Sequence, residues 1–104
     1  MVFEENNILF LHIITGRRKK DRLLAYLADN GCQLINTTYA FGTITPSHLE
    51  SLIGVVPEVE KVMISCLIHK KDKEMLFQTL LEDFAFKKPN TGIAYTVPIE
   101  EVSF

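Results

Sequence analysis

The soft metal ligands of this 104-residue chain are three histidines and two cysteines at scattered positions: His12, His48, His69, Cys32 and Cys66. A zinc signature brings such ligands together in short pairs such as Cys-x-x-Cys, and the sequence has no such pair of cysteines. We therefore expect no metal site. We expect two buried thiols rather than a disulfide, as in a reducing compartment. His12 lies in an apolar run, which favours a hydrogen-bonded core or interface histidine.

A second group of side chains could bind an anion. The run Arg17-Arg18-Lys19-Lys20 comes directly before a predicted helix. Cations at a helix N-terminus oppose its dipole by about 0.3 to 1 kcal/mol each at low salt, and a bound anion would remove that cost. Arg17 and Arg18 are therefore candidates for an anion-binding corner. The competing interpretation is a solvated corner, in which Asp21 offsets part of the cost.

The sequence carries no catalytic signature. It contains neither a Gly-x-Ser-x-Gly nucleophile motif nor a Walker phosphate loop. The acidic pair Glu100-Glu101 belongs to a predicted strand, where successive side chains point to opposite faces, so the two carboxylates cannot act together. We do not expect an enzyme.

Hydrophobic patterning predicts the elements that position these residues. Runs rich in β-formers predict strands, and apolar residues that recur every three or four positions predict helices. Thr15-Gly16 is expected to break the first strand, and Asn30-Gly31 to end the first helix. Thr45-Pro46 is typical of a helix start. The predicted strands are 7–14, 32–41, 61–68 and a closing run at 92–102, and the predicted helices are 22–30, 46–53 and 73–84.

The order of these elements predicts an α+β fold. Two strand-helix-strand halves form a ferredoxin-like βαβ-βαβ sandwich: a four-stranded antiparallel sheet with two long helices on one face, and a short extra helix in the middle loop. Lys19-Lys20-Asp21 recurs as Lys70-Lys71-Asp72, each time between a strand and a helix. The length suits a single domain at 1–104. The helical stripes expected in the core are Leu23, Leu24, Leu27 and Ala28, then Leu76, Phe77, Leu80, Leu81 and Phe84.

In such a fold one sheet face has no helices over it. That face would carry Ile8, Phe10 and Ile14 from the first strand, and Met63 and Leu67 from the third. A surface this apolar is expected to be buried by another copy of the chain. The pattern therefore predicts an oligomer.

Charge and hydropathy exclude some partners. The formal net charge is −2 and the pI is about 5.9, so we expect no binding to nucleic acid. The longest apolar run, 8–14, is far below the ~20 residues of a membrane-spanning helix, so we expect no membrane insertion. No basic leader precedes an apolar stretch near the first residue, and we expect a cytoplasmic location.

Three stretches resemble the PII signal-transduction proteins, the nitrogen regulatory protein PII superfamily. The closing run has Gly92, five further residues and then Pro-Ile-Glu-Glu-Val, as in the last strand of that family. The segment 26–31, Tyr-Leu-Ala-Asp-Asn-Gly, is similar to the family's first helix and its glycine exit. The segment 39–42, Tyr-Ala-Phe-Gly, is similar to the end of its second strand. Together these stretches span the chain from the first predicted helix to the closing strand, on either side of the middle loop.

The resemblance implies a homotrimer whose sheets face inward, with a small-molecule site in each cleft between subunits. In PII proteins this site holds ATP or ADP, between the base of a long loop after the second strand and the turn before the last strand. Gly42 and Gly92 match these two places, and Thr43, Lys88 and Thr91 are neighbours able to reach a phosphate. The candidate ligands are ATP, ADP and AMP. The family's role implies regulation of a membrane transporter or a metabolic enzyme.

The sequence departs from the family in the middle loop. The long mobile loop is replaced by the short apolar helix at 46–53, whose Leu49, Leu52 and Ile53 are candidates for docking a partner protein. Ile93 stands where the family usually has a lysine. For Gly42 and Gly92 the competing interpretation is a turn that needs positive φ.

Two other function classes stay open. One is a CutA-like trimer, a related fold that has been linked to divalent cations. The other is a purely structural interaction module.

Overall fold

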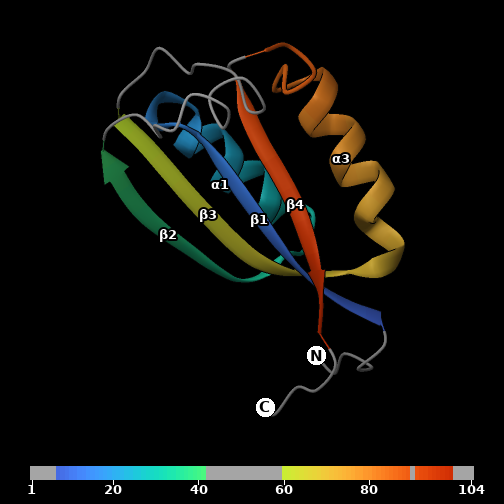
Figure 1. The fold of residues 1–104 in the computed structure, drawn as a ribbon. Coiled ribbons are helices and arrows are strands. Elements are labelled where there is room, and N and C mark those ends of the chain that lie inside the picture. Colours follow the sequence, from blue (N-terminus) through green and yellow to red (C-terminus); the bar gives the residue numbers. More distant parts are fainter. Residues whose placement is uncertain (1–6, 42–59, 90, 100–104) are drawn as a thin grey trace.

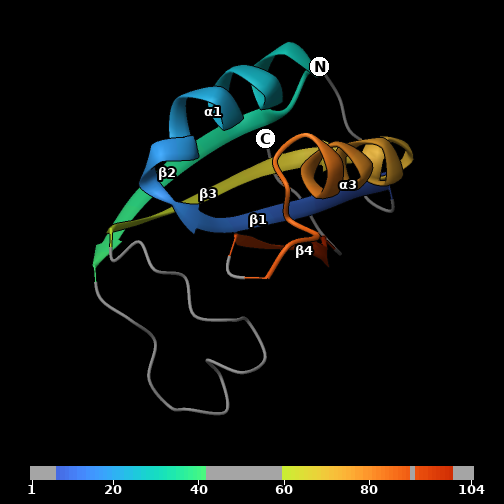
Figure 2. The ribbon, with the colours of Figure 1, turned by 90° about the horizontal axis from the view of Figure 1, so that it is seen from above.

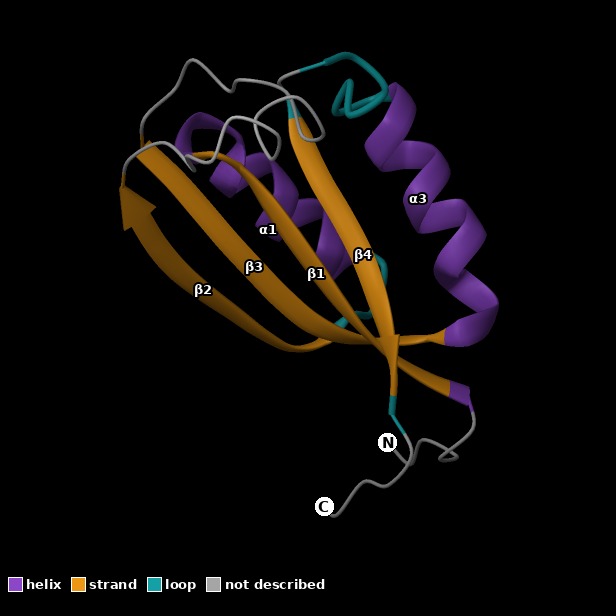
Figure 3. Ribbon diagram, in the orientation of Figure 1, coloured by secondary structure: helices purple, strands orange, loops and turns teal. Residues whose placement is uncertain are grey.

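The computed structural model describes residues 7–41, 60–89 and 91–99 of the chain. Its strands form one antiparallel sheet in the order β2-β3-β1-β4 (Figure 1). The two helices each follow a central strand (Figure 3). The elements are β1 Ile8–Gly16, α1 Lys20–Asp29, β2 Gln33–Phe41, β3 Glu60–His69, α3 Lys73–Glu82 and β4 Gly92–Pro98, with 3-10 turns at Arg17–Lys19 and Lys70–Asp72.

This architecture is the predicted ferredoxin-like α+β fold. β1 and β3 are the central strands, and Figure 2 shows α1 and α3 on the same side of the sheet. The short helix expected at 46–53 lies outside the described residues. Helix α1 begins at Lys20, two residues earlier than expected.

β1 is longer than its sequence pattern indicated. Thr15 lies opposite Val62 of β3 and Gly92 of β4, and its side chain is almost fully buried. Strands on both sides therefore hold Thr15 in the sheet, and Gly16 pairs with Lys61 of β3, so the strand break expected at these residues is wrong. Pairing on both edges outweighs the local preference of a Thr-Gly pair for a turn.

The core lies between the helices and one face of the central strands. Alternate residues of β1 and β3 point to this face, as the period of two requires. Each fully buried aliphatic side chain contributes about 1.5 to 3 kcal/mol. Ala28 of α1 and Leu81 of α3 were expected in the helical stripes but are exposed, since the sheet lies under a narrower face of each helix than the sequence indicated. The buried cluster is Leu9, Leu11, Ile13, Leu23, Leu27, Val62, Ile64, Cys66, Ile68, Leu76, Leu80 and Phe84.

The repeated Lys-Lys-Asp motif does not occupy equivalent places in the two halves. Asp72 directly precedes α3 as its N-cap residue, whereas Asp21 lies inside the first turn of α1. Relative to the first residue of its helix, the motif in the second half therefore lies two residues earlier than the motif in the first half. Both carboxylates still lie near a helix N-terminus, where negative charge is favourable.

The two helices end differently. After α1, the backbone N–H groups of Gly31 and Cys32 donate to the carbonyls of Ala28 and Leu27, and Gly31 has φ of +76°. This is a Schellman ending with glycine at the left-handed position, as Asn30-Gly31 predicted. After α3, the left-handed residue is Ala85, with φ of +62°.

We predict that Ala85→Gly stabilises the protein by about 0.5 to 1 kcal/mol. Glycine removes the steric cost of a Cβ in the left-handed conformation. Its greater conformational entropy in the unfolded chain offsets part of this stabilisation. Urea unfolding measures the change. The matched control is Ala28→Gly on the exposed face of α1, which should cost about 1 kcal/mol. Destabilisation of both variants to the same extent would contradict the prediction.

Candidate functional site at one end of the sheet

Four strand ends meet at the upper end of the sheet in Figure 1, which we call the site end. β1 and β2 end here, and β3 and β4 begin here. The registers pair Phe41 with Glu60 and place Gly92 opposite Thr15. The antiparallel order thus brings the start of β4, with Thr91 and Gly92, to the same end as the borders of the connection at 42–59.

A buried hydrogen bond fixes the turn before β4. The Thr15 hydroxyl donates to the Thr91 carbonyl at 2.7 Å, and the Thr91 hydroxyl donates to the Pro89 carbonyl at 3.4 Å. Thr15 is 1% exposed, so its hydroxyl depends on this partner. The end of β1 therefore sets the position of the Thr91 backbone.

Gly92 is required by a close approach rather than by its backbone conformation. A Cβ at this position would lie 2.6 Å from the ring of Phe86, which packs over the glycine. Gly31 is the described glycine that has positive φ. The interpretation of Gly92 as a turn residue with positive φ is therefore wrong, because an aromatic ring occupies the space of a side chain.

The other predicted site residues are either exposed or outside the described residues. Lys88 is exposed on the loop between α3 and β4, where its backbone N–H donates to the Ala85 carbonyl at 3.0 Å. Gly42 and Thr43 lie outside the described residues, next to the last residue of β2. The proposed docking residues also lie outside them: Leu49, Leu52 and Ile53.

Arg17 ties the borders of the 42–59 connection together. Its guanidinium donates to the carbonyls of Lys61 and Ala40 at 3.3 to 3.4 Å and lies 3.9 Å from a carboxylate oxygen of Glu60. The guanidinium carbon is also 4.4 Å from the ring centroid of Tyr39, a cation–π contact. Arg17 thus holds β2 and β3 together at the site end, while Arg18 is exposed beside it.

The rest of the basic run also contacts the protein. Lys19 donates to the Phe84 carbonyl at 2.6 Å, just beyond the C-terminus of α3, where a cation is favourable. Arg22 lies over the Phe84 ring at 4.9 Å. Lys20 hydrogen-bonds the Tyr39 hydroxyl at 2.7 Å, which raises the pKa of the lysine. The run expected to bind an anion therefore joins the start of α1 to the end of α3 and to β2.

Sequence reasoning missed Tyr39 and Phe86. Tyr39 contacts two cations, Arg17 and Lys20. Phe86 packs against Gly92 and also contacts the ammonium of Lys19. Both contacts join residues far apart in the sequence, so spacing gave no signal for them. The available hint was the concentration of cations at one strand-to-helix junction.

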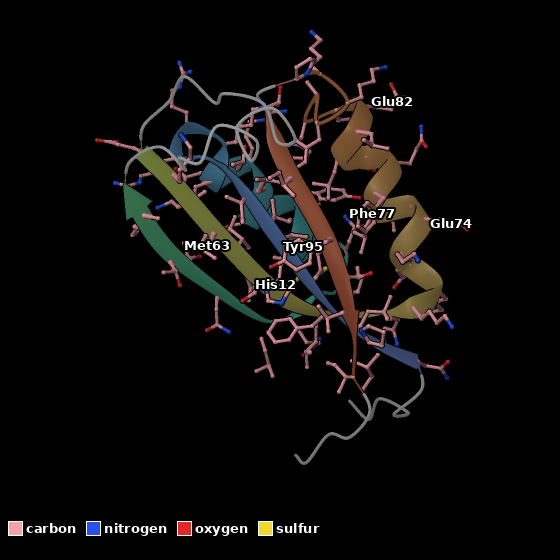
Figure 4. All side chains as sticks on the ribbon, viewed as in Figure 1. His12, Met63, Glu74, Phe77, Glu82 and Tyr95 are labelled. Atoms are coloured by element: carbon pink, nitrogen blue, oxygen red, sulfur yellow. The ribbon has the colours of Figure 1, made fainter. Side chains whose placement is uncertain are left out.

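The sheet face opposite the helices, which we call the outer face, carries an aromatic stack. The ring of His12 lies between those of Phe10 and Tyr95, with centroid distances of 4.5 and 5.0 Å. Met63 and Tyr95 are 40% and 44% exposed. Figure 4 shows His12, Met63 and Tyr95 together in front of the sheet. At the end of this face opposite the site end, Ile8 and Leu67 pack against Phe10 and Ile99.

No group of three or more metal-binding side chains gathers among the residues that the structure describes. Cys66 and His69 are three residues apart, but on β3 they belong to opposite faces of the sheet. Within the same part of the chain, no helix is long and apolar enough to cross a membrane.

No protein-family model matches the chain, and no curated protein matches it. Solved structures do. A Thermus thermophilus protein described as a PII-like signaling protein is 18% identical, with a TM-score of 0.64 over 86% of this chain and 84% of that one. The ATP complex of Bacillus subtilis GlnK is 15% identical, with a TM-score of 0.62 over 94% of this chain and 86% of that one.

A Bacillus cereus protein related to NIF3 also matches, with 11% identity and a TM-score of 0.66. The match covers 97% of this chain but 27% of that much longer protein. At these identities the likeness concerns the fold. The chain has the ferredoxin-like fold found in PII-like proteins.

We predict that Gly92→Ala destabilises the protein by about 1 to 3 kcal/mol, because the new methyl group would overlap the Phe86 ring. In the double variant with Phe86→Ala, the glycine substitution should cost much less, which a double-mutant cycle in urea measures.

Gly31→Ala is the matched control. A Cβ there meets no atom within 4 Å, so its cost comes from positive φ and should be the same with or without Phe86. Equal costs of Gly92→Ala in the two backgrounds would contradict the steric role of Phe86.

Proposed function

We propose that this chain is a PII-like signalling regulator rather than an enzyme. It acts in the cytoplasm as a homotrimer, holds a small anionic effector in the clefts between copies, and regulates a membrane transporter or a metabolic enzyme. Adenine nucleotides (ATP, ADP or AMP) are the first effectors to test. The observation that carries the proposal is the uncovered apolar outer face in a chain with this fold.

The outer face supports self-association. Met63, Tyr95 and Val97 are each at least 40% exposed and lie on two strands, β3 and β4, that flank β1 with the stacked ring of His12. Exposed apolar surface of this kind is favourable to bury, and aromatic residues and methionine are enriched at protein interfaces. The covering partner needs a complementary apolar surface, which a second copy of the chain offers. Threefold association follows from the resemblance to PII proteins.

The site end supports an effector site. Thr91 offers a hydroxyl and a fixed backbone, and the exposed Lys88 and Arg18 offer cations within the same part of the fold. Charge-assisted hydrogen bonds from such groups are the usual means of holding phosphate. Gly42 and Thr43 would complete the site from the other strand end. The solved ATP complex of the similar GlnK makes ATP a reasonable first probe.

Arg17 has a different role in this proposal. Its guanidinium donates to two backbone carbonyls and stacks on Tyr39, so it positions the borders of the connection. Arg18 is the residue of the pair proposed to meet the anion. The connection itself, with Leu49, Leu52 and Ile53, is proposed to dock on the regulated protein.

The CutA-like alternative finds less support. It would need several metal ligands in one place, and the described residues bring no such group together. A purely structural module would share the assembly but would bind no effector, so the nucleotide experiment separates it from the proposed regulator.

We predict that the chain forms a trimer of 11.9 kDa subunits at micromolar concentration, measured by sedimentation or light scattering. Met63→Lys should produce single chains, because it would bury three ammonium groups in the assembly without partners. Leu81→Lys is a closely matched control: Leu81 is also 40% exposed but lies on α3, so this variant should stay trimeric. A wild-type protein that sediments as a single chain would contradict the assembly.

We predict that an adenine nucleotide raises the melting temperature. A ligand at a hundred times its Kd adds about 2.7 kcal/mol, which corresponds to roughly 10 to 20 °C in a domain of this size. Lys88→Ala should reduce the shift by removing a cation from the site end. Lys73→Ala removes an exposed lysine at the opposite end of α3 and should leave the shift unchanged.

If ATP, ADP and AMP at millimolar concentration leave the melting of the trimer unchanged, nucleotide sensing is refuted. Equal loss of the shift in the two lysine variants would instead refute the location of the site.

A further inference from the structure

The two cysteines, far apart in the sequence, meet in the fold. Cys66 lies in the middle of β3 with none of its surface exposed, and Cys32 packs against the same core cluster from the end of α1. Gln33 lies opposite Leu67, so Cys32 is the diagonal neighbour of Cys66 across the β2–β3 pair. Both thiols are free, and each is the main influence on the other's pKa.

The surroundings of the two thiols differ. Cys32 is half-buried, whereas Cys66 is completely enclosed. The hydrogen bond from Cys66 lowers the pKa of the Cys32 thiol, against the opposing effects of burial and of the Asp72 carboxylate. The same hydrogen bond and burial raise the pKa of Cys66. Cys32 is therefore the thiol that ionises first and that solvent can reach, and thiolate character with exposure favours oxidation.

The backbone beside Cys32 leaves the regular ladder. The β2–β3 register shifts between Gln33 and Asn36, and Leu34 within this bulge has φ of +51° and a side chain that is 64% exposed. A bulky residue in the left-handed region stores strain, and bulges interrupt strand pairing. The segment that carries Cys32 is thus less constrained by the sheet than the strand that carries Cys66. Cys32 itself lies just before β2, and its N–H donates to the Leu27 carbonyl of α1 at 3.0 Å.

We propose that Cys32 is a site of reversible oxidation by hydroperoxides, and that Cys66 is the resolving thiol that closes an intramolecular disulfide. The proposal is independent of the effector and of the assembly. The disulfide would join the exit of α1 to the central strand β3.

The chemistry takes two steps. The Cys32 thiolate attacks the peroxide, forming an S–O bond and breaking the O–O bond; the released hydroxide takes up a proton, and Cys32 becomes a sulfenic acid. The Cys66 sulfur then attacks the Cys32 sulfur, forming the S–S bond, and its proton leaves with the hydroxyl group as water. Two thiols lose two electrons in total, and hydrogen peroxide becomes two molecules of water. A dithiol reductant restores both thiols.

The enclosed position of Cys66 explains the order of these steps. While Cys32 is a thiolate, Cys66 keeps its proton, because Cys32 and burial raise the pKa of Cys66. Oxidation of Cys32 removes that negative charge and makes its sulfur the electrophile beside Cys66. Enclosure in the core also protects Cys66 from direct oxidation by solvent peroxide.

The test is mass spectrometry of the folded full-length chain after treatment with hydrogen peroxide. We expect the mass to fall by two hydrogens, a single peptide pair linked through Cys32 and Cys66, and complete reversal by dithiothreitol. Peptide mapping is needed because the three methionines also take up oxygen. The Cys66→Ala variant should stop at a Cys32 sulfenic acid that dimedone traps, and in Cys32→Ala the remaining cysteine should stay unmodified.

Circular dichroism shows whether each variant is folded, and the wild-type experiment does not depend on them. Unchanged cysteine peptides in the treated wild type would overturn the proposal. So would a disulfide between two chains, seen as a covalent dimer on a non-reducing gel, or equal modification of both thiols in the single variants.

Discussion

The two central strands carry large apolar side chains on both faces, but α1 and α3 cover only one of these faces. Leu11 and Ile64 point toward the helices, while Phe10, Ile14 and Met63 point the other way. An antiparallel sheet in water usually has a polar outer face, but on β3 that face alternates polar residues with Met63 and Leu67. The chain by itself therefore covers only one face of its two central strands. The proposed assembly, and any cleft between copies, depend on how the other half is covered.

Local sequence signals were sufficient for the architecture. The alternation in β1 and β3, the apolar stripes of the helices and the Asn30-Gly31 exit each predicted the element that the structure contains. The errors came from tertiary context. Thr15 and Gly16 are typical turn residues, but Thr15 pairs with strands on both sides and Gly16 pairs with β3, which retains both in β1. A short stretch of sequence does not show whether distant strands will pair with it.

The site was harder to predict than the fold for a related reason. Gly92 was predicted as a ligand-site residue, with a turn of positive φ as the alternative, whereas the ring of Phe86 is what excludes a side chain there. Arg17 was predicted to bind an anion, and Lys19 belongs to the same basic run, but both donate to carbonyls of distant segments. In each case the partner lies on another element and reaches the residue only through the fold. Gly92 and Arg17 nevertheless lie at the same end of the sheet, as the predicted topology requires.

The contacts of Arg17 have a consequence for sequence divergence. Its two hydrogen-bond acceptors are main-chain oxygens, at Ala40 and Lys61, so substitution of either side chain leaves those acceptors in place. One arginine can therefore preserve the spacing of the two strand ends while the residues around it drift. The intervening segment could then change its length or composition over evolution without disturbing the strands that bear it.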